Sequence, residues 1–106
     1  MCEADKSAGS AVGSVLIENA RTRVTEWRFP AKGDNTGWHL HEHDYVVVPL
    51  ADGQLELREP GGQTRFAELR KGVPYFREKG ARHDVVNYNA FEFAFIEIEF
   101  LDGGGS

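Results

Sequence analysis

The chain contains one cysteine, Cys2, and no long apolar run. A single cysteine cannot form a disulfide within the chain. No apolar stretch approaches the roughly 20 residues that a membrane-spanning helix needs. No positively charged segment followed by an apolar one opens the chain, as it would in a secretory signal. These absences predict a soluble protein of the cytoplasm.

Basic residues are also few. The 106 residues include 12 Lys and Arg against 17 Asp and Glu, for a formal net charge of −5. A surface with this balance repels nucleic-acid backbones and anionic lipids, so neither nucleic acid nor a membrane is an expected partner. The length allows one domain with one modest core.

Stretches with helical periodicity of useful length are absent as well. Short runs of β-branched and aromatic residues alternate instead with turns rich in Gly and Pro, as at residues 30–37 and 60–62. Strands spaced about every 8–12 residues are typical of a sandwich or barrel. We therefore predict an all-β barrel over residues 15–101, between flexible tails at 1–14 and 102–106. The predicted strands span residues 15–19, 22–29, 38–50, 54–58, 64–69, 73–76, 84–87 and 91–100.

The last predicted strand has apolar residues of both parities. Phe93 and Phe95 share one parity, whereas Ile96 and Ile98 share the other. Either a bulge shifts the register of the strand, or both of its faces are covered. In so small a domain the second face is often covered by another subunit. We favour this explanation, which predicts a homodimer.

Histidines, by contrast, are clustered. Three of the four lie at His39, His41 and His43, and the fourth stands alone at His83. Residues i, i+2 and i+4 of a strand face the same way, so this spacing aims three imidazoles toward one side. Borderline transition metals prefer imidazole ligands. The spacing predicts half of a metal site with His83 as the distant ligand; the alternative is histidines that bind no ion.

The sequence around these histidines resembles the two conserved motifs of the cupin superfamily. The matching positions are mainly glycines and histidines, in Gly33-x5-His39-x-His41 with Gly53, and in Gly72-x5-Glu78-x-Gly80-x2-His83-x3-Asn87. Glu78 stands where the family usually has proline. Two motifs in the right order and separation are far more specific than either motif alone.

The resemblance implies a single-domain cupin fold, the jelly-roll barrel or double-stranded β-helix. It also implies one divalent transition metal, zinc, iron, nickel or manganese, bound by His39, His41 and His83. The family usually adds a glutamate where this chain has Tyr45 or Val46. Without it the site holds three neutral imidazoles and is more positive by one unit. A small polar, anionic ligand should then bind more readily.

Four further residues are candidates for the pocket. His43 either lines its mouth or lies on the rim, and Tyr45 is expected to bury its ring and hydrogen-bond through its hydroxyl. Trp38 forms a wall of the pocket or packs in the core. Arg82 is a candidate clamp for a carboxylate, although it neighbours His83 and adjacent strand residues face opposite ways.

A closer resemblance, over residues 24–29, 37–39 and 43–50, is to small bacterial single-domain cupins, some of them labelled as β-alanine degradation proteins. It implies a metal-dependent cupin that acts on a small polar metabolite, as an oxygenase or another enzyme of small-carboxylate or amino-acid catabolism. The alternative is a non-catalytic cupin that binds or senses a small ligand. The sequence offers no catalytic triad, phosphate-binding loop or nicotinamide fingerprint, which keeps this alternative open.

Overall fold

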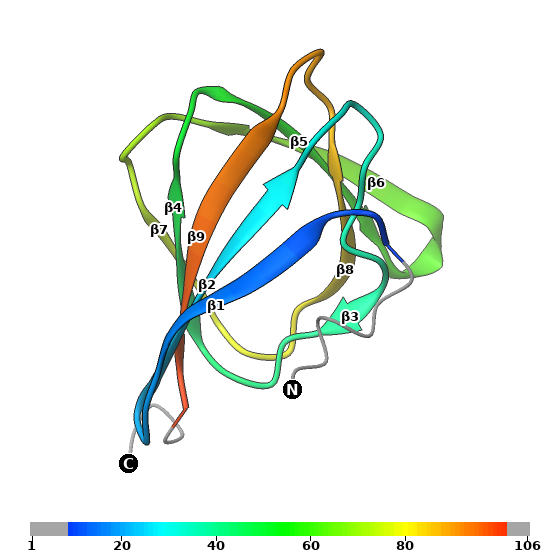
Figure 1. Ribbon diagram of the computed structural model, residues 1–106. Coiled ribbons are helices and arrows are strands. Elements are labelled where there is room, and N and C mark those ends of the chain that lie inside the picture. Colours follow the sequence, from blue (N-terminus) through cyan, green and yellow to red (C-terminus); the bar gives the residue numbers. More distant parts are fainter. Residues whose placement is uncertain (1–8, 102–106) are drawn as a thin grey trace.

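The computed structural model describes residues 9–101, which form two antiparallel sheets (Figure 1). The first sheet has the strand order β1-β2-β9-β4-β7 and the second β3-β8-β5-β6. The described residues contain no α-helix and one short 3₁₀ turn at Pro60–Gly62, so the all-β prediction is confirmed. The strands are β1 (Val12–Glu18), β2 (Thr22–Phe29), β3 (His39–Leu40), β4 (Tyr45–Pro49), β5 (Gly53–Glu59), β6 (Gln63–Leu69), β7 (Tyr75–Arg77), β8 (Arg82–Asn87) and β9 (Phe93–Phe100).

The core lies between the two sheets because alternate residues of β2, β4 and β5 point inward and are buried. In β2, for example, Trp27 and Phe29 are buried while Arg28 between them is not. Burying such a side chain stabilises the fold by about 1.5–3 kcal/mol. The core is contributed by both sheets and consists of Trp27, Phe29, Tyr45, Val47, Leu55, Leu57, Leu69, Val85, Phe93 and Phe95.

The predicted strand at residues 38–50 is in fact two strands in different sheets. β3 pairs with β8 in the second sheet, whereas β4 pairs with β7 and β9 in the first. Between them the backbone of His41 bonds the turn before β8: its N–H donates to the Ala81 carbonyl, and its carbonyl accepts from Gly80. The chain therefore changes sheets directly after the second histidine, and the strand parity does not continue to His43.

β9 contains no bulge. It pairs with β2 in unbroken register from Thr22↔Phe100 to Phe29↔Phe93, so the bulge alternative is wrong. Phe93 and Phe95 point into the core, and Glu97 follows them on the same face and is also buried. Ile96 and Ile98 consequently lie on the outer face of the first sheet.

A row of apolar side chains crosses this outer face. The register of the five strands aligns Ile17, Val24, Ile98, Val46 and Phe76. The residues at the two ends, Ile17 and Phe76, are both more than half exposed. β1 itself is exposed along its whole length. We call these five residues the outer row.

Pairing at the amino-terminal end begins earlier than residue 15. β1 starts at Val12, and the Ala11 N–H already donates to the Asn35 carbonyl. The remaining parts of the predicted tails, residues 1–8 and 102–106, lie outside the described residues. Within residues 9–101 there is no helix long and apolar enough to span a membrane.

Candidate metal centre

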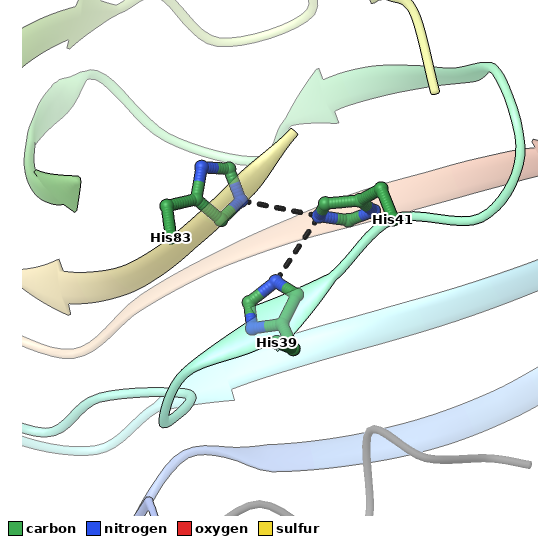
Figure 2. Close-up of side chains that lie close together, drawn as sticks. All are labelled: His39, His41 and His83. Atoms are coloured by element: carbon green, nitrogen blue, oxygen red, sulfur yellow. Dashed lines mark hydrogen bonds between the residues drawn. The ribbon is translucent and has the colours of Figure 1, made fainter. Parts of the chain in front are cut away.

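Three histidines from two segments of the second sheet converge at one end of the core (Figure 2). His39 in β3 is the register partner of His83 in β8, and His41 follows β3 directly. The Nε2 atom of His41 lies 3.0 Å from Nε2 of His39 and 3.1 Å from Nε2 of His83. His41 and His83 are buried, and His39 is half-buried. The structure thus brings together the three histidines that the sequence proposed as ligands.

The two contacts between Nε2 atoms cannot both be hydrogen bonds, because the three neutral rings have too few hydrogens on these nitrogens. His39 Nδ1 lies 2.8 Å from the Gly37 carbonyl, which can only accept, so Nδ1 carries the hydrogen and Nε2 presents a lone pair. A hydrogen on His41 Nε2 can serve one neighbouring nitrogen well but not both. Two nitrogens bound at about 2.0–2.1 Å to one ion are roughly 2.8–3.4 Å apart, which matches the observed separations. The donor set therefore fits a bound cation.

Burial keeps the cluster neutral. Desolvation, followed by the neighbouring His39 imidazole, lowers the pKa of His41 to about 2 and that of His83 to about 3. Desolvation also lowers the pKa of His39, against the opposing effect of its hydrogen bond to Gly37. Neutral imidazole is the form that binds a metal, so protons do not compete for these nitrogens near neutral pH.

The turn before β3 holds His39 in place. The Asp84 carboxylate, one residue after His83, accepts a 2.9 Å hydrogen bond from the Gly37 N–H. Gly37 in turn accepts from His39 Nδ1 through its carbonyl. Its φ of +88° lies in the left-handed region that favours glycine. His39 and the strand of His83 are thereby connected through Asp84 and Gly37, and hydrogen bonds of this kind orient histidines in known metal sites.

Comparisons with known proteins place this arrangement in a family. The chain is 53% identical over 89 residues to the Beta-alanine degradation protein BauB of Pseudomonas aeruginosa, across 84% of this chain and 92% of that protein. A cupin domain from Bordetella pertussis superimposes with a TM-score of 0.81 at 48% identity, covering 86% of this chain and 93% of that one. The chain is a small cupin.

A more distant structure shares the fold alone. A double-stranded β-helix protein from Klebsiella pneumoniae has a TM-score of 0.70 at 21% identity, covering 100% of this chain and 92% of that one. No protein-family model matches the chain. The likeness to these two solved structures confirms the cupin fold that the two sequence motifs predicted.

A carboxyl group that the sequence analysis did not single out lies beside the cupin histidines. Glu97 Oε2 is 3.9 Å from His41 Nε2, and the residue is 8% exposed. Burial, followed by the neighbouring Glu99, raises the pKa of Glu97 to about 8 against a hydrogen bond from Trp27. The expected site consisted of three neutral imidazoles, and Glu97 was not among its candidate residues. Its signal in the sequence was the parity that Glu97 shares with Phe93 and Phe95.

Tyr45 packs against the centre. Its ring stacks on His41 with centroids 4.0 Å apart and an interplanar angle of 15°. Burial raises the pKa of the Tyr45 phenol, with Glu97 as the next cause, so its hydroxyl keeps its proton at neutral pH. Stacking restricts the rotation of the His41 ring and holds its Nε2 toward the other two histidines.

Two spaces meet at the histidines. An inner cavity is lined by all three histidines, Tyr45 and Glu97. The volume in which the centre of a water molecule fits there is about 20 Å³. An outer cleft is much larger, about 500 Å³ by the same measure, and is lined by Trp38, Arg82 and His39 among others. His39 lines both spaces and thus separates them.

The four pocket candidates are therefore distributed unevenly. Tyr45 lines the inner cavity, while Trp38 and Arg82 line the outer cleft, where Trp38 is 53% exposed rather than packed in the core. His43 lines neither space; it lies in the segment between β3 and β4, after the chain has left the second sheet.

Proposed function

We propose that this cupin is a cytoplasmic protein that binds one divalent transition-metal ion through His39, His41 and His83. The observation that carries the proposal is the meeting of three ring nitrogens at 3.0 and 3.1 Å with too few hydrogens to bond them. A metal cation can accept the lone pairs of all three nitrogens. Zinc, iron, nickel and manganese all accept imidazole ligands.

The proposed ligand is a small polar anion that enters from the outer cleft. Arg82 is exposed there and offers a planar pair of donors to a carboxylate. Trp38 offers an apolar wall on the same side. A small carboxylate with an apolar part fits these two residues, and its charge suits a cation held by neutral imidazoles.

The reaction class that we propose is an oxygenase or another metal-dependent step in small-carboxylate or amino-acid catabolism. A redox-active ion with open positions supplies dioxygen activation, whereas zinc supplies a Lewis acid. The relative BauB is named for β-alanine degradation, which agrees with a small carboxylate substrate.

A non-catalytic cupin that binds or senses a small ligand is the second candidate. The inner cavity leaves room for about one water molecule, so an organic ligand has to remain in the open cleft. An open cleft protects reactive intermediates from water poorly, which favours binding without chemistry.

Metal analysis and oxygen uptake separate the two candidates. Protein purified without added metal should contain about one equivalent of a transition metal per chain, or take it up on reconstitution. An oxygen electrode with a panel of small carboxylates and amino acids then tests the oxygenase. Uptake above the no-enzyme rate supports the enzyme; binding of a carboxylate without turnover supports the sensor. A chain that stays metal-free after reconstitution contradicts both metal-dependent functions.

We further propose that the cupin assembles as a homodimer through the outer row. Its apolar side chains span five strands, and β1 is a fully exposed edge strand with Val12, Val15 and Leu16 each about half exposed. An antiparallel pair of identical edges is self-complementary under a two-fold axis, so a second copy can cover both features at once.

Sedimentation tests this assembly. The parent should have the mass of two chains at high micromolar concentration. Ile17→Asp and Phe76→Asp, at the exposed ends of the outer row, should shift it to one chain. Val73→Asp is the matched control, since Val73 is exposed to a similar degree outside the row. A parent of single-chain mass contradicts the proposal.

A further inference from the structure

The inner cavity is small and separate from the cleft that we assign to the organic ligand. A cavity holds a water molecule only if it leaves about 10–15 Å³ for the centre of that molecule. The inner cavity offers about 20 Å³, enough for a ligand of one or two heavy atoms. His39 stands between it and the outer cleft.

Much of the cavity wall is apolar, contributed by Val47, Leu55, Leu57 and Phe95 among others. Glu97 interrupts this wall with a carboxyl group. A buried carboxyl group is costly unless it is hydrogen-bonded. The Trp27 side chain supplies one hydrogen bond to it. Its other face turns to the histidines, where Oε2 lies 3.9 Å from His41 Nε2.

That separation is too long for a direct hydrogen bond and also longer than the roughly 2.8–3.4 Å between adjacent ligands on one ion. It is the kind of gap that a bridging water-sized group fills. Glu99, two residues along the same face, also has a carboxyl oxygen within 4.8 Å of His41, but its Oε1 accepts from Arg23 Nε at 2.7 Å. Of these two neighbouring carboxyl groups, only Glu97 lines the cavity.

We infer that the inner cavity is a subsite for one hydrogen-bonding ligand of one or two heavy atoms, such as water, and that Glu97 bonds this ligand against the histidine cluster. Glu97 is then a positioning residue that contacts the small ligand and not the ion. The organic ligand occupies the outer cleft and the small ligand the inner cavity, and His39 lines both. This assignment deepens the proposed metal site, but the cavity and Glu97 can be tested with or without an ion.

Crystals of the metal-free and the zinc-loaded protein test the subsite directly. An ordered water within about 3.2 Å of the Glu97 carboxyl group and facing His41 is the expected result. The same water should be missing from Glu97→Leu and present in Glu99→Gln, the matched control. An empty cavity overturns the inference, and so does a Glu97 oxygen bound directly to the zinc.

Fluoride and acetate binding to the cobalt-loaded protein gives a second readout. Visible absorption of Co²⁺ reports both the ion and its small ligands. Glu97→Leu should bind Co²⁺ within about threefold of the parent yet bind fluoride at least about tenfold more weakly, while acetate, which fits only the cleft, is unaffected. Unchanged fluoride affinity overturns the inference. If the parent binds no Co²⁺, the proposed metal site fails, and the water in the metal-free crystal still decides the subsite.

Discussion

Two groups of buried polar side chains interrupt the core, and they satisfy their polar atoms in different ways. Around Asn87, which is completely buried, donors meet acceptors: Nδ2 faces the carbonyls of Phe29, Ala31 and Phe91, and Oδ1 accepts from the backbone and side chain of Asn89. Around His41, ring nitrogen meets ring nitrogen. We call these groups the asparagine network and the histidine cluster.

The difference supports the proposal that the histidine cluster binds a ligand, whereas the asparagine network serves the fold. The asparagine network is complete with the atoms of the chain, so it stabilises the folded state by itself. The histidine cluster has more lone pairs than hydrogens and becomes complete when a cation is added. Removing a residue from the first group should change stability, and removing one from the second should change binding.

The largest expected effect is a loss of metal affinity, and it distinguishes the three histidines of the cluster from the neighbouring His43. His39→Ala, His41→Ala and His83→Ala should each lower metal affinity more than about 100-fold, because two ligands remain where three were present. His43→Ala should keep most of the metal, since it lies outside the cluster. Elemental analysis after dialysis against a weak chelator measures the difference. Loss of metal from His43→Ala but not from His83→Ala would show a site local to one segment.

Next in size is the effect of breaking the asparagine network. Asn87→Ala should lower the free energy of unfolding by about 3 kcal/mol or more, since it leaves several buried carbonyl and amide groups without partners at about 1–3 kcal/mol each. Urea unfolding measures this loss. Asn19→Ala is the control: its exposed side chain accepts from the N–H groups of Arg21 and Thr22, so its loss should cost about 1 kcal/mol. Equal losses would remove the distinction between buried and exposed amides.

A third test uses pH on the metal-free protein. The pKa of Glu97 is about 8 in the folded chain against an ordinary 4.5, so the folded state retains a proton that the unfolded state releases between these values. Stability contributed by Glu97 therefore falls as pH rises through this window, by up to about 1.4 kcal/mol per pH unit. Glu97→Gln removes this dependence.

Urea unfolding with a chelator at pH 5 and pH 8 gives the comparison. The free energy of unfolding of Glu97→Gln, relative to that of the parent, should rise by about 2 kcal/mol or more from pH 5 to pH 8. An advantage that stays constant would show that Glu97 ionises normally and that its surroundings are wetter than the structure indicates.

The smallest expected effect concerns the turn that connects the two ligands. Gly37→Ala and Gly33→Ala both place alanine at a positive φ, +88° and +93°, and should each cost about 1 kcal/mol of stability. Only Gly37 accepts from His39, so only its variant should weaken metal binding, by roughly three- to tenfold. Calorimetric titration with Zn²⁺ resolves a change of this size. Equal affinities would mean that the turn does not orient His39.

Local patterns in the sequence predicted most of the fold. The strand at Thr22–Phe29 has the bounds that its alternation predicted, because one face is buried and the other is not. The last residue of the second motif, Asn87, donates to backbone carbonyls at the end of its strand. Alternation and turn residues act over a few positions, so these features can be found without tertiary information.

Features that depend on distant pairing could not be predicted in this way. The break after His41 follows from its bonds to Gly80 and Ala81, some 40 residues away, and the parity that grouped His43 with His41 ignored it. Glu97 was missed for a related reason. Acidic side chains are mostly exposed in proteins, whereas the unbroken pairing of β9 places Glu97 inside.

The pairing of His39 with His83 has a mechanical consequence. With an ion bound, the two strands are tied at positions 44 residues apart, and the chain between them becomes a closed ring. A force that pulls on residues 9 and 101 then passes through the ion, and the ring carries no load until a metal–ligand bond breaks. Rupture releases a hidden length of roughly 150 Å, at about 3.3–3.6 Å for each residue. A single bound atom would thus decide whether nearly half of this chain feels tension.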